Sequence, residues 1–143
     1  MHLFSDDVSF IERNIKCDAT YKTDKFDSIN DEIFRCSNPL GSVFLEVVSN
    51  GNNSEEIKRT SLTWKQWHND ISPKQTEVTA RQFAAVISKL YLKDKEIEFV
   101  DMFFNDIPAK FSNIIYDVET STKEKEFYTL RKVVVNFNIP EKD

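Results

Sequence analysis

The chain of 143 residues has the length of one ordinary domain, and its 40% hydrophobic residues, including 12 Phe, supply enough apolar volume for a core. Only two glycines are present, which excludes the glycine-rich loops that cradle phosphates in P-loop and dinucleotide sites. The net charge of −5 disfavours nucleic acid and anionic membranes as partners. We therefore expect residues 1–143 to form a single domain that carries no cofactor.

The negative charge is concentrated in the first third of the chain. Residues 1–56 contain 11 acidic and 5 basic side chains. A surface of that sign accelerates encounters with a basic protein, and it also keeps a protein in solution. On the first interpretation, the acids that would contact a basic protein partner are Asp6, Asp7, Asp18, Asp24, Asp27, Asp31 and Glu32.

The cysteines and the N-terminus predict a cytoplasmic location. Two cysteines, Cys17 and Cys36, are fewer than small disulfide-dependent secreted domains usually carry, so buried reduced thiols are expected. Residues 1–10 lack the basic and apolar segments of a signal peptide. No apolar run is long enough to cross a bilayer as a helix, so no membrane contact is expected.

In chain order, the first local signature is that of a short helix over residues 28–34, where a capping serine precedes apolar residues. Residues 42–48 are rich in β-branched side chains and precede the turn sequence at 50–53. This pattern predicts a strand that pairs with residues 57–62 in a hairpin.

Two helices are predicted next. Thr63 and Gln66 match the T-x-x-Q pattern of a capping box and begin a short helix that Pro73 ends. The same pattern at Thr79 begins a longer helix over residues 79–93, whose apolar side chains recur at helical spacing.

The remaining elements are predicted as strands. Residues 95–104 alternate in part, although their apolar positions also fit a helix. The runs 113–120 and 126–139 are rich in β-forming residues and predict a long antiparallel hairpin. In the second run the apolar positions change parity near Arg131 and Lys132, which indicates either a β-bulge or burial of both faces.

Together these elements predict an α+β fold. Antiparallel hairpins over residues 42–62 and 113–139 form the sheet, and two or three helices pack on one face of it. If the strand 126–139 lies at an edge, its unpaired backbone can accept the same strand of a second copy, which makes a homodimer possible.

Carboxylates and a lysine near residue 56 resemble part of a metal-dependent nuclease site. Glu56 and Lys58 match an E-x-K motif, and Glu46 on the preceding strand is a possible second carboxylate. In a chain with 24 acids, however, such a triplet is expected by chance. We therefore expect no catalytic role for these residues, although they remain the candidates for one.

The sequence gives equally little support for a catalytic or metal-binding histidine. His68 is the one histidine away from the terminus, and Asp70 would point to another face of the expected helix and could not orient its ring. His2, Cys17, Cys36 and His68 have the ligand types of a zinc site without its usual paired spacing. No metal site is expected.

Aromatic residues gather around residues 64–68 and offer either core packing or a partner anchor. Trp67 occupies the hydrophobic-staple position of the expected helix, which predicts its burial. Trp64 is then the side chain expected to reach the surface, and it completes the set of partner-binding candidates.

By elimination, the favoured function is that of a small acidic protein without enzymatic activity. It would inhibit one protein partner with a basic surface stoichiometrically, as bacterial immunity proteins and phage-borne inhibitors do. Two alternatives remain open. One is a carboxylate- and metal-dependent hydrolase or nuclease, and the other is a structural subunit that assembles through the strand 126–139.

Overall fold

The structure is a computed structural model that describes residues 2–26, 29–51, 55–68, 73–105, 110–112 and 115–137. Its elements in chain order are α1 (Phe4–Asn14), β1 (Asp18–Phe26), β2 (Ile29–Ser37), β3 (Val43–Ser49), β4 (Ile57–Trp67), α2 (Pro73–Tyr91), α3 (Glu96–Asn105), β5 (Lys110–Ser112), β6 (Tyr116–Glu124) and β7 (Tyr128–Phe137).

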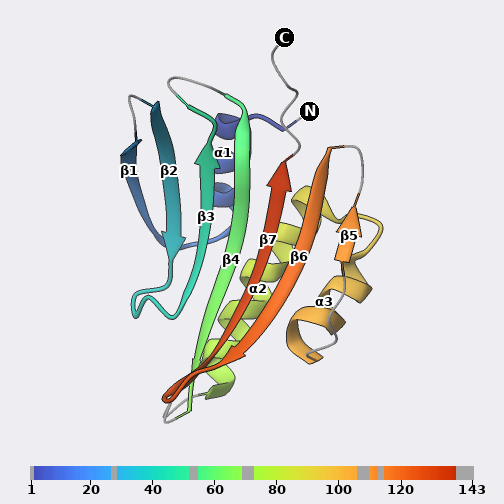
Figure 1. The fold of residues 1–143 in the computed structure, drawn as a ribbon. Coiled ribbons are helices and arrows are strands. Elements are labelled where there is room, and N and C mark those ends of the chain that lie inside the picture. Colours follow the sequence, from blue (N-terminus) through green and yellow to red (C-terminus); the bar gives the residue numbers. More distant parts are fainter. Residues whose placement is uncertain are drawn as a thin grey trace.

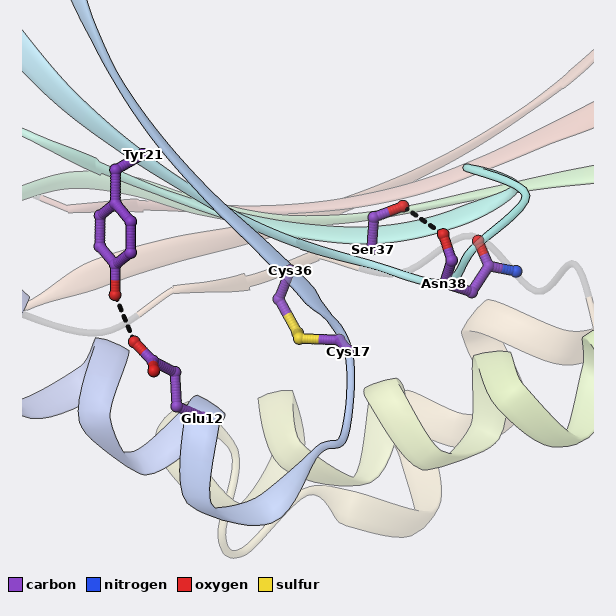
Figure 2. The surroundings of a disulfide bond; sticks show 6 residues. All are labelled: Glu12, Cys17, Tyr21, Cys36, Ser37 and Asn38. Atoms are coloured by element: carbon purple, nitrogen blue, oxygen red, sulfur yellow. Dashed lines mark hydrogen bonds between the residues drawn. A yellow bond between two sulfur atoms is a disulfide. The ribbon is translucent and has the colours of Figure 1, made fainter.

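The strands form one antiparallel sheet in the order β1-β2-β3-β4-β7-β6-β5 (Figure 1). The first four strands follow one another across the sheet. The chain then crosses through α2 and α3 to the opposite edge, and it returns through β5, β6 and β7 until β7 pairs with β4. The helices lie on one side of the sheet, which is plain in the edge-on view of Figure 2. The expected α+β fold is therefore confirmed.

The hydrophobic core lies between the sheet and the helices. Alternate side chains of the central strands face the helices, and the helices present their apolar stripes in return. The largest fully buried side chains include Phe34, Leu45, Leu62, Phe83, Ile87, Phe99, Val118, Val133 and Val135.

Both predicted hairpins are present. Residues 42–62 form the β3–β4 pair, and residues 113–139 contain the β6–β7 pair. The turn of the second hairpin lies at 125–127, a few residues later than expected, because β6 continues through the polar run to Glu124. Polar and charged side chains are tolerated there because both faces of this strand end are exposed.

The helix expected at Thr63 is wrong, because β4 continues to Trp67. In that register Thr63 pairs with Phe44 on one side and with Lys132 on the other. Two flanking strands satisfy the backbone of β4 on both edges, and this pairing outweighs a local capping pattern that the chain does not use.

Pro73 begins a helix, where it was expected to end one. α2 starts at Pro73, six residues before the predicted start at Thr79, and ends at Tyr91, close to the predicted end. Proline suits the first turn of a helix because the backbone N–H that it lacks has no partner there. Thr79 therefore lies inside the helix.

Two further predictions are wrong in type, because one expected strand is a helix and one expected helix is a strand. Of the residues 95–104, expected as a strand, all but the first belong to α3, in which Phe99 and Phe103 stack with ring centroids 5.9 Å apart. The helix expected at 28–34 is replaced by β2, which pairs with β1 and β3. No element was expected over residues 4–14, which form α1.

The strand β7 is interior, so the expected edge pairing and homodimer through residues 126–139 are wrong. Its neighbours are β4 and β6, and its register with both runs without a shift, which also excludes the bulge near Arg131 and Lys132. The change of parity in the apolar positions of β7 arises because both faces of the strand carry partly or fully buried side chains. Leu130 lies half-buried on one face, and Val133 is buried on the opposite face.

The cysteines form a disulfide, so the expectation of reduced thiols is wrong. Cys17 precedes β1 and bonds to Cys36 of β2, with Cα atoms 5.5 Å apart and a sequence separation of 19 (Figure 2). Since both sulfurs are joined, the zinc set of His2, Cys17, Cys36 and His68 is also excluded.

Candidate partner-binding surface

The sheet has one face toward the helices and one face that no described helix covers. Thr60 and Trp64 of β4 face the helices, because Thr60 hydrogen-bonds Tyr91 of α2 (2.9 Å) and Trp64 packs on Phe104 of α3 (5.6 Å between ring centroids). Side chains alternate along a strand, so Lys65 and its outward neighbours point the other way. We call this second surface the helix-free face.

An aromatic pair marks one end of the helix-free face. Trp67 ends β4 and pairs in register with Tyr128, which begins β7, and their ring centroids lie 4.7 Å apart. The Trp67 side chain is 44% exposed. The ammonium of Lys65 lies 5.9 Å from the Tyr128 ring centroid, and Leu130 pairs with Lys65 beside the two rings. This end combines aromatic area with positive charge.

The two tryptophans exchange the roles expected of them. Trp64 is 2% exposed, so its assignment as a partner-binding residue is wrong, and Tyr91 is buried as well. The expectation relied on helical staple geometry, whereas in a strand residues 64 and 67 point to opposite faces. The parity change at Tyr128 and Leu130 is the sequence signal that could have located this surface.

The described acids among those expected to bind a partner do not form one patch. Asp6 and Asp18 are exposed, on α1 and β1 respectively. Asp24 pairs with Asp31 in the β1–β2 ladder, and Asp27 lies outside the described residues. The other three, Asp7, Asp31 and Glu32, each accept hydrogen bonds from side chains of the same chain.

Asp7 is the centre of a buried polar network and is not a surface residue. It is 4% exposed and accepts hydrogen bonds from the Tyr91 hydroxyl (2.7 Å) and from Nδ1 of His2 (3.1 Å). Since the Tyr91 hydrogen is used in this way, the Thr60 hydroxyl donates to the Tyr91 oxygen (2.9 Å). Burial, followed by the charge of Asp7, raises the pKa of Tyr91 well above its usual value.

Asp31 and Glu32 follow one another on β2 and therefore point to opposite faces. Glu32 is half-buried and accepts a hydrogen bond from the Thr23 hydroxyl (3.1 Å). Asp31 accepts hydrogen bonds from Nζ of Lys58 (2.9 Å) and from the backbone N–H of Gly51 (2.8 Å), a residue whose φ of 85° favours glycine. Asp31 and Glu32 are thus engaged by different partners on opposite faces of the sheet.

The ion pair of Asp31 predicts a pH-dependent contribution to stability. Partial burial opposes ionisation, but the hydrogen bonds from Lys58 and Gly51 outweigh it and lower the pKa of Asp31. A lowered folded pKa stabilises the fold above the unfolded value of about 3.9, and this contribution disappears as pH falls through the folded pKa. We expect Asp31→Asn to reduce the free energy of unfolding by about 1 kcal/mol at neutral pH and to have little effect near pH 2.

Urea unfolding of both proteins at the two pH values measures this difference. Asp18→Asn, at an exposed position of the neighbouring strand, is the matched control and should change stability by less than about 0.5 kcal/mol. Equal losses for Asp31→Asn at both pH values would contradict the ion pair.

The residues considered for a nuclease site are held apart by different partners. Glu46 on β3 pairs with Arg35 (3.2 Å), Lys58 pairs with Asp31, and the exposed Glu56 accepts a hydrogen bond from Asn50 (3.2 Å). Within the described residues, His, Cys, Asp and Glu do not gather in any group of three or more that could hold a metal ion.

His68 contacts a carboxylate that sequence spacing did not indicate. Its Nε2 lies 3.1 Å from the Thr129 hydroxyl oxygen and 3.6 Å from the Glu124 carboxylate, while Asp70 lies outside the described residues. A catalytic triad needs the acid on the ring nitrogen that does not face the nucleophile. Here both partners meet the same nitrogen and Thr129 is buried, so the arrangement does not suit nucleophilic catalysis.

None of the helices in the described ranges has both the length and the apolar character needed to cross a membrane. Comparison with protein-family models, with curated proteins and with solved structures finds no match for this chain.

Proposed function

We propose that this protein is a non-enzymatic binding protein that occupies a surface of one protein partner and so inhibits it stoichiometrically. The observation that carries the proposal is the outward-facing Trp67 on the helix-free face, in contact with Tyr128. Tryptophan and tyrosine dominate the binding energy of protein interfaces, because each ring buries a large area and loses little conformational entropy.

The surroundings of Trp67 support this role. Half-buried Leu130 and Lys65 flank the aromatic pair, whereas Ser61 and Thr63, further along β4 on the same face, are buried and add little to the accessible surface. A rigid strand holds every one of these residues. A binding surface on strands costs less ordering entropy on association than one on loops.

We propose an oxidising compartment as the place of action, in preference to the cytoplasm expected from the sequence. That expectation rested on reduced thiols, and the Cys17–Cys36 disulfide removes this support. Disulfides form and persist in secreted and other oxidising environments.

Truncating the aromatic pair tests the function. Trp67→Ala should weaken partner binding about 30-fold, which corresponds to a hot-spot loss of about 2 kcal/mol. The measurement is quantitative capture of host proteins on the immobilised chain, followed by calorimetric titration of any stoichiometric partner. The matched control is Ile97→Ala, which removes a 78% exposed apolar side chain from α3 on the helix side.

A partner bound equally well by Trp67→Ala and by the wild type would contradict the proposed surface. Capture of no stoichiometric protein by the folded wild-type chain, in oxidising buffer, would contradict the proposed function itself.

A further inference from the structure

Three lysines lie together on the helix-free face, beside the aromatic pair. In the β4–β7 register Lys65 pairs with Leu130 and Thr63 pairs with Lys132. In the β7–β6 register Leu130 pairs with Lys123 and Lys132 pairs with Ser121. One row across β4, β7 and β6 therefore contains Lys65, Leu130 and Lys123. The adjacent row contains Thr63, Lys132 and Ser121. We call Lys65, Lys123 and Lys132 the lysine patch.

The described residues of these two rows contain no acidic side chain to neutralise the lysine patch. The nearest acids of β6 have other positions. Glu124 turns toward Thr129, whose hydroxyl donates to it (3.0 Å), and Glu119 lies one row further along, opposite Val134. In the adjoining turn Lys125 and Glu126 offset one another in charge. The patch is therefore a local positive surface on a chain of net charge −5.

We propose that the helix-free face binds an acidic segment of the protein partner, whose carboxylates contact the lysine patch while an apolar side chain packs on Trp67 and Tyr128. This inference rests on the proposed function and names the chemistry of the partner. It replaces the expected basic partner, because the described acids on which that expectation relied lie on different elements, are buried or are paired.

The dimensions suit a short segment. The patch spans β4 to β6, about 10 Å at the usual strand spacing, and two rows, about 7 Å along the strands. Such an area accommodates two or three carboxylates. A longer polyanion such as single-stranded nucleic acid would continue over Glu119 and Asp117 on the same face, where like charges repel it.

A synthetic probe tests the chemistry without knowledge of the partner. The probe is a blocked Glu-Glu-Phe-Glu-Glu peptide, titrated into the full chain while tryptophan emission is followed. Trp64 is buried, so a change in emission reports on Trp67. We expect saturable binding that weakens with added salt, because screening reduces attraction between exposed charges.

Removal of positive charge from the lysine patch should weaken binding of the peptide probe. Lys65→Gln, Lys123→Gln and Lys132→Gln combined should raise the Kd about tenfold, from three modest charge contacts. The matched control combines Lys22→Gln, Lys93→Gln and Lys95→Gln, three exposed lysines outside the patch, and should leave the Kd unchanged. Thermal melts establish that both triple variants are folded.

Each other outcome overturns the acidic-segment proposal. No binding of the acidic peptide, or equal loss in both triple variants, removes the lysine patch from the interface. Tighter binding of a Lys-Lys-Phe-Lys-Lys peptide points to a basic partner, and tighter binding of a single-stranded oligonucleotide points to nucleic acid. If the captured partner depends on Trp67 but not on the lysines, the proposed function stands and only its acidic partner chemistry falls.

Discussion

Replacing Asp7 by Ala is expected to lower the free energy of unfolding by about 3 kcal/mol, although sequence analysis placed this residue at a binding surface. The substitution removes the acceptor of the Tyr91 hydroxyl and the partner of His2. Tyr91 is buried, and without Asp7 the Thr60 hydroxyl is the remaining side-chain partner given for its O–H. The buried Tyr91 therefore loses its charged acceptor, and hydrogen bonds to charged groups contribute more than those between neutral groups.

Asp6→Ala is the matched control for this prediction. Asp6 is adjacent in the first turn of α1, where both carboxylates interact similarly with the helix dipole, but it is exposed. It should change stability by less than about 0.5 kcal/mol. Denaturant unfolding of the two variants gives both values. Equal effects of the two substitutions would show that the Asp7 network contributes nothing beyond the dipole.

Partner binding separates the two interpretations of Asp7. A residue at the interface weakens binding when it is replaced and leaves stability intact, whereas the buried residue does the reverse in any molecule that remains folded. The titration with Glu-Glu-Phe-Glu-Glu should therefore give the same Kd for folded Asp7→Ala and for the wild type.

Reducing the Cys17–Cys36 disulfide is expected to cost about 3 kcal/mol of stability, as the chain-entropy model gives for a closed loop of this length. The bond joins the segment before the edge strand β1 to β2, and β1 pairs only with β2 among the described strands. Without the bond, we expect β1 to separate first, because all described side chains over residues 18–23 are exposed.

The measurement is urea unfolding with and without a thiol reductant, with hydrogen exchange to locate the loss. The combined Cys17→Ala and Cys36→Ala variant is the control, since its stability should not respond to the reductant. A wild-type protein that is equally stable in both buffers would contradict the prediction and would withdraw the support that the disulfide gives to an oxidising compartment.

Local sequence patterns correctly predict the two hairpins, in which a short turn joins the paired strands. Residues 42–62 and 113–139 form hairpins because β-branched residues flank a turn, and both partners lie close in sequence. The end of α2 near Tyr91 also follows from its apolar stripe.

Elements with distant partners could not be assigned in this way. β4 receives its second neighbour, β7, from more than sixty residues further along the chain, as the pairing of Thr63 with Lys132 illustrates. A capping pattern at Thr63 describes what the segment can do alone, and pairing on both edges decides what it does. The exchange of helix and strand at 95–104 has a related cause, since alternating and helical spacings overlap in a short apolar run.

The candidate surface shows the same division. The aromatic residues near position 64 are visible in the sequence as a possible anchor, but Trp64 is its exposed member only if the segment is a helix, and the segment is a strand. Along β4 the alternation of side chains buries Trp64 and exposes Trp67. The β4–β7 register adds Tyr128 and Lys132 to that surface, and the β6–β7 register adds Lys123.

The sequence by itself determined the α+β class, the two hairpins and the end of the long helix, because turn chemistry and periodicity act between residues close in the chain. The tertiary structure alone decided that Asp7 is buried, that Cys17 meets Cys36, that β7 is interior and that Trp67 faces outward. These features depend on which distant strands pair and on which sheet face the helices cover. Both are settled by burial of the whole chain's apolar surface, and no local pattern encodes them.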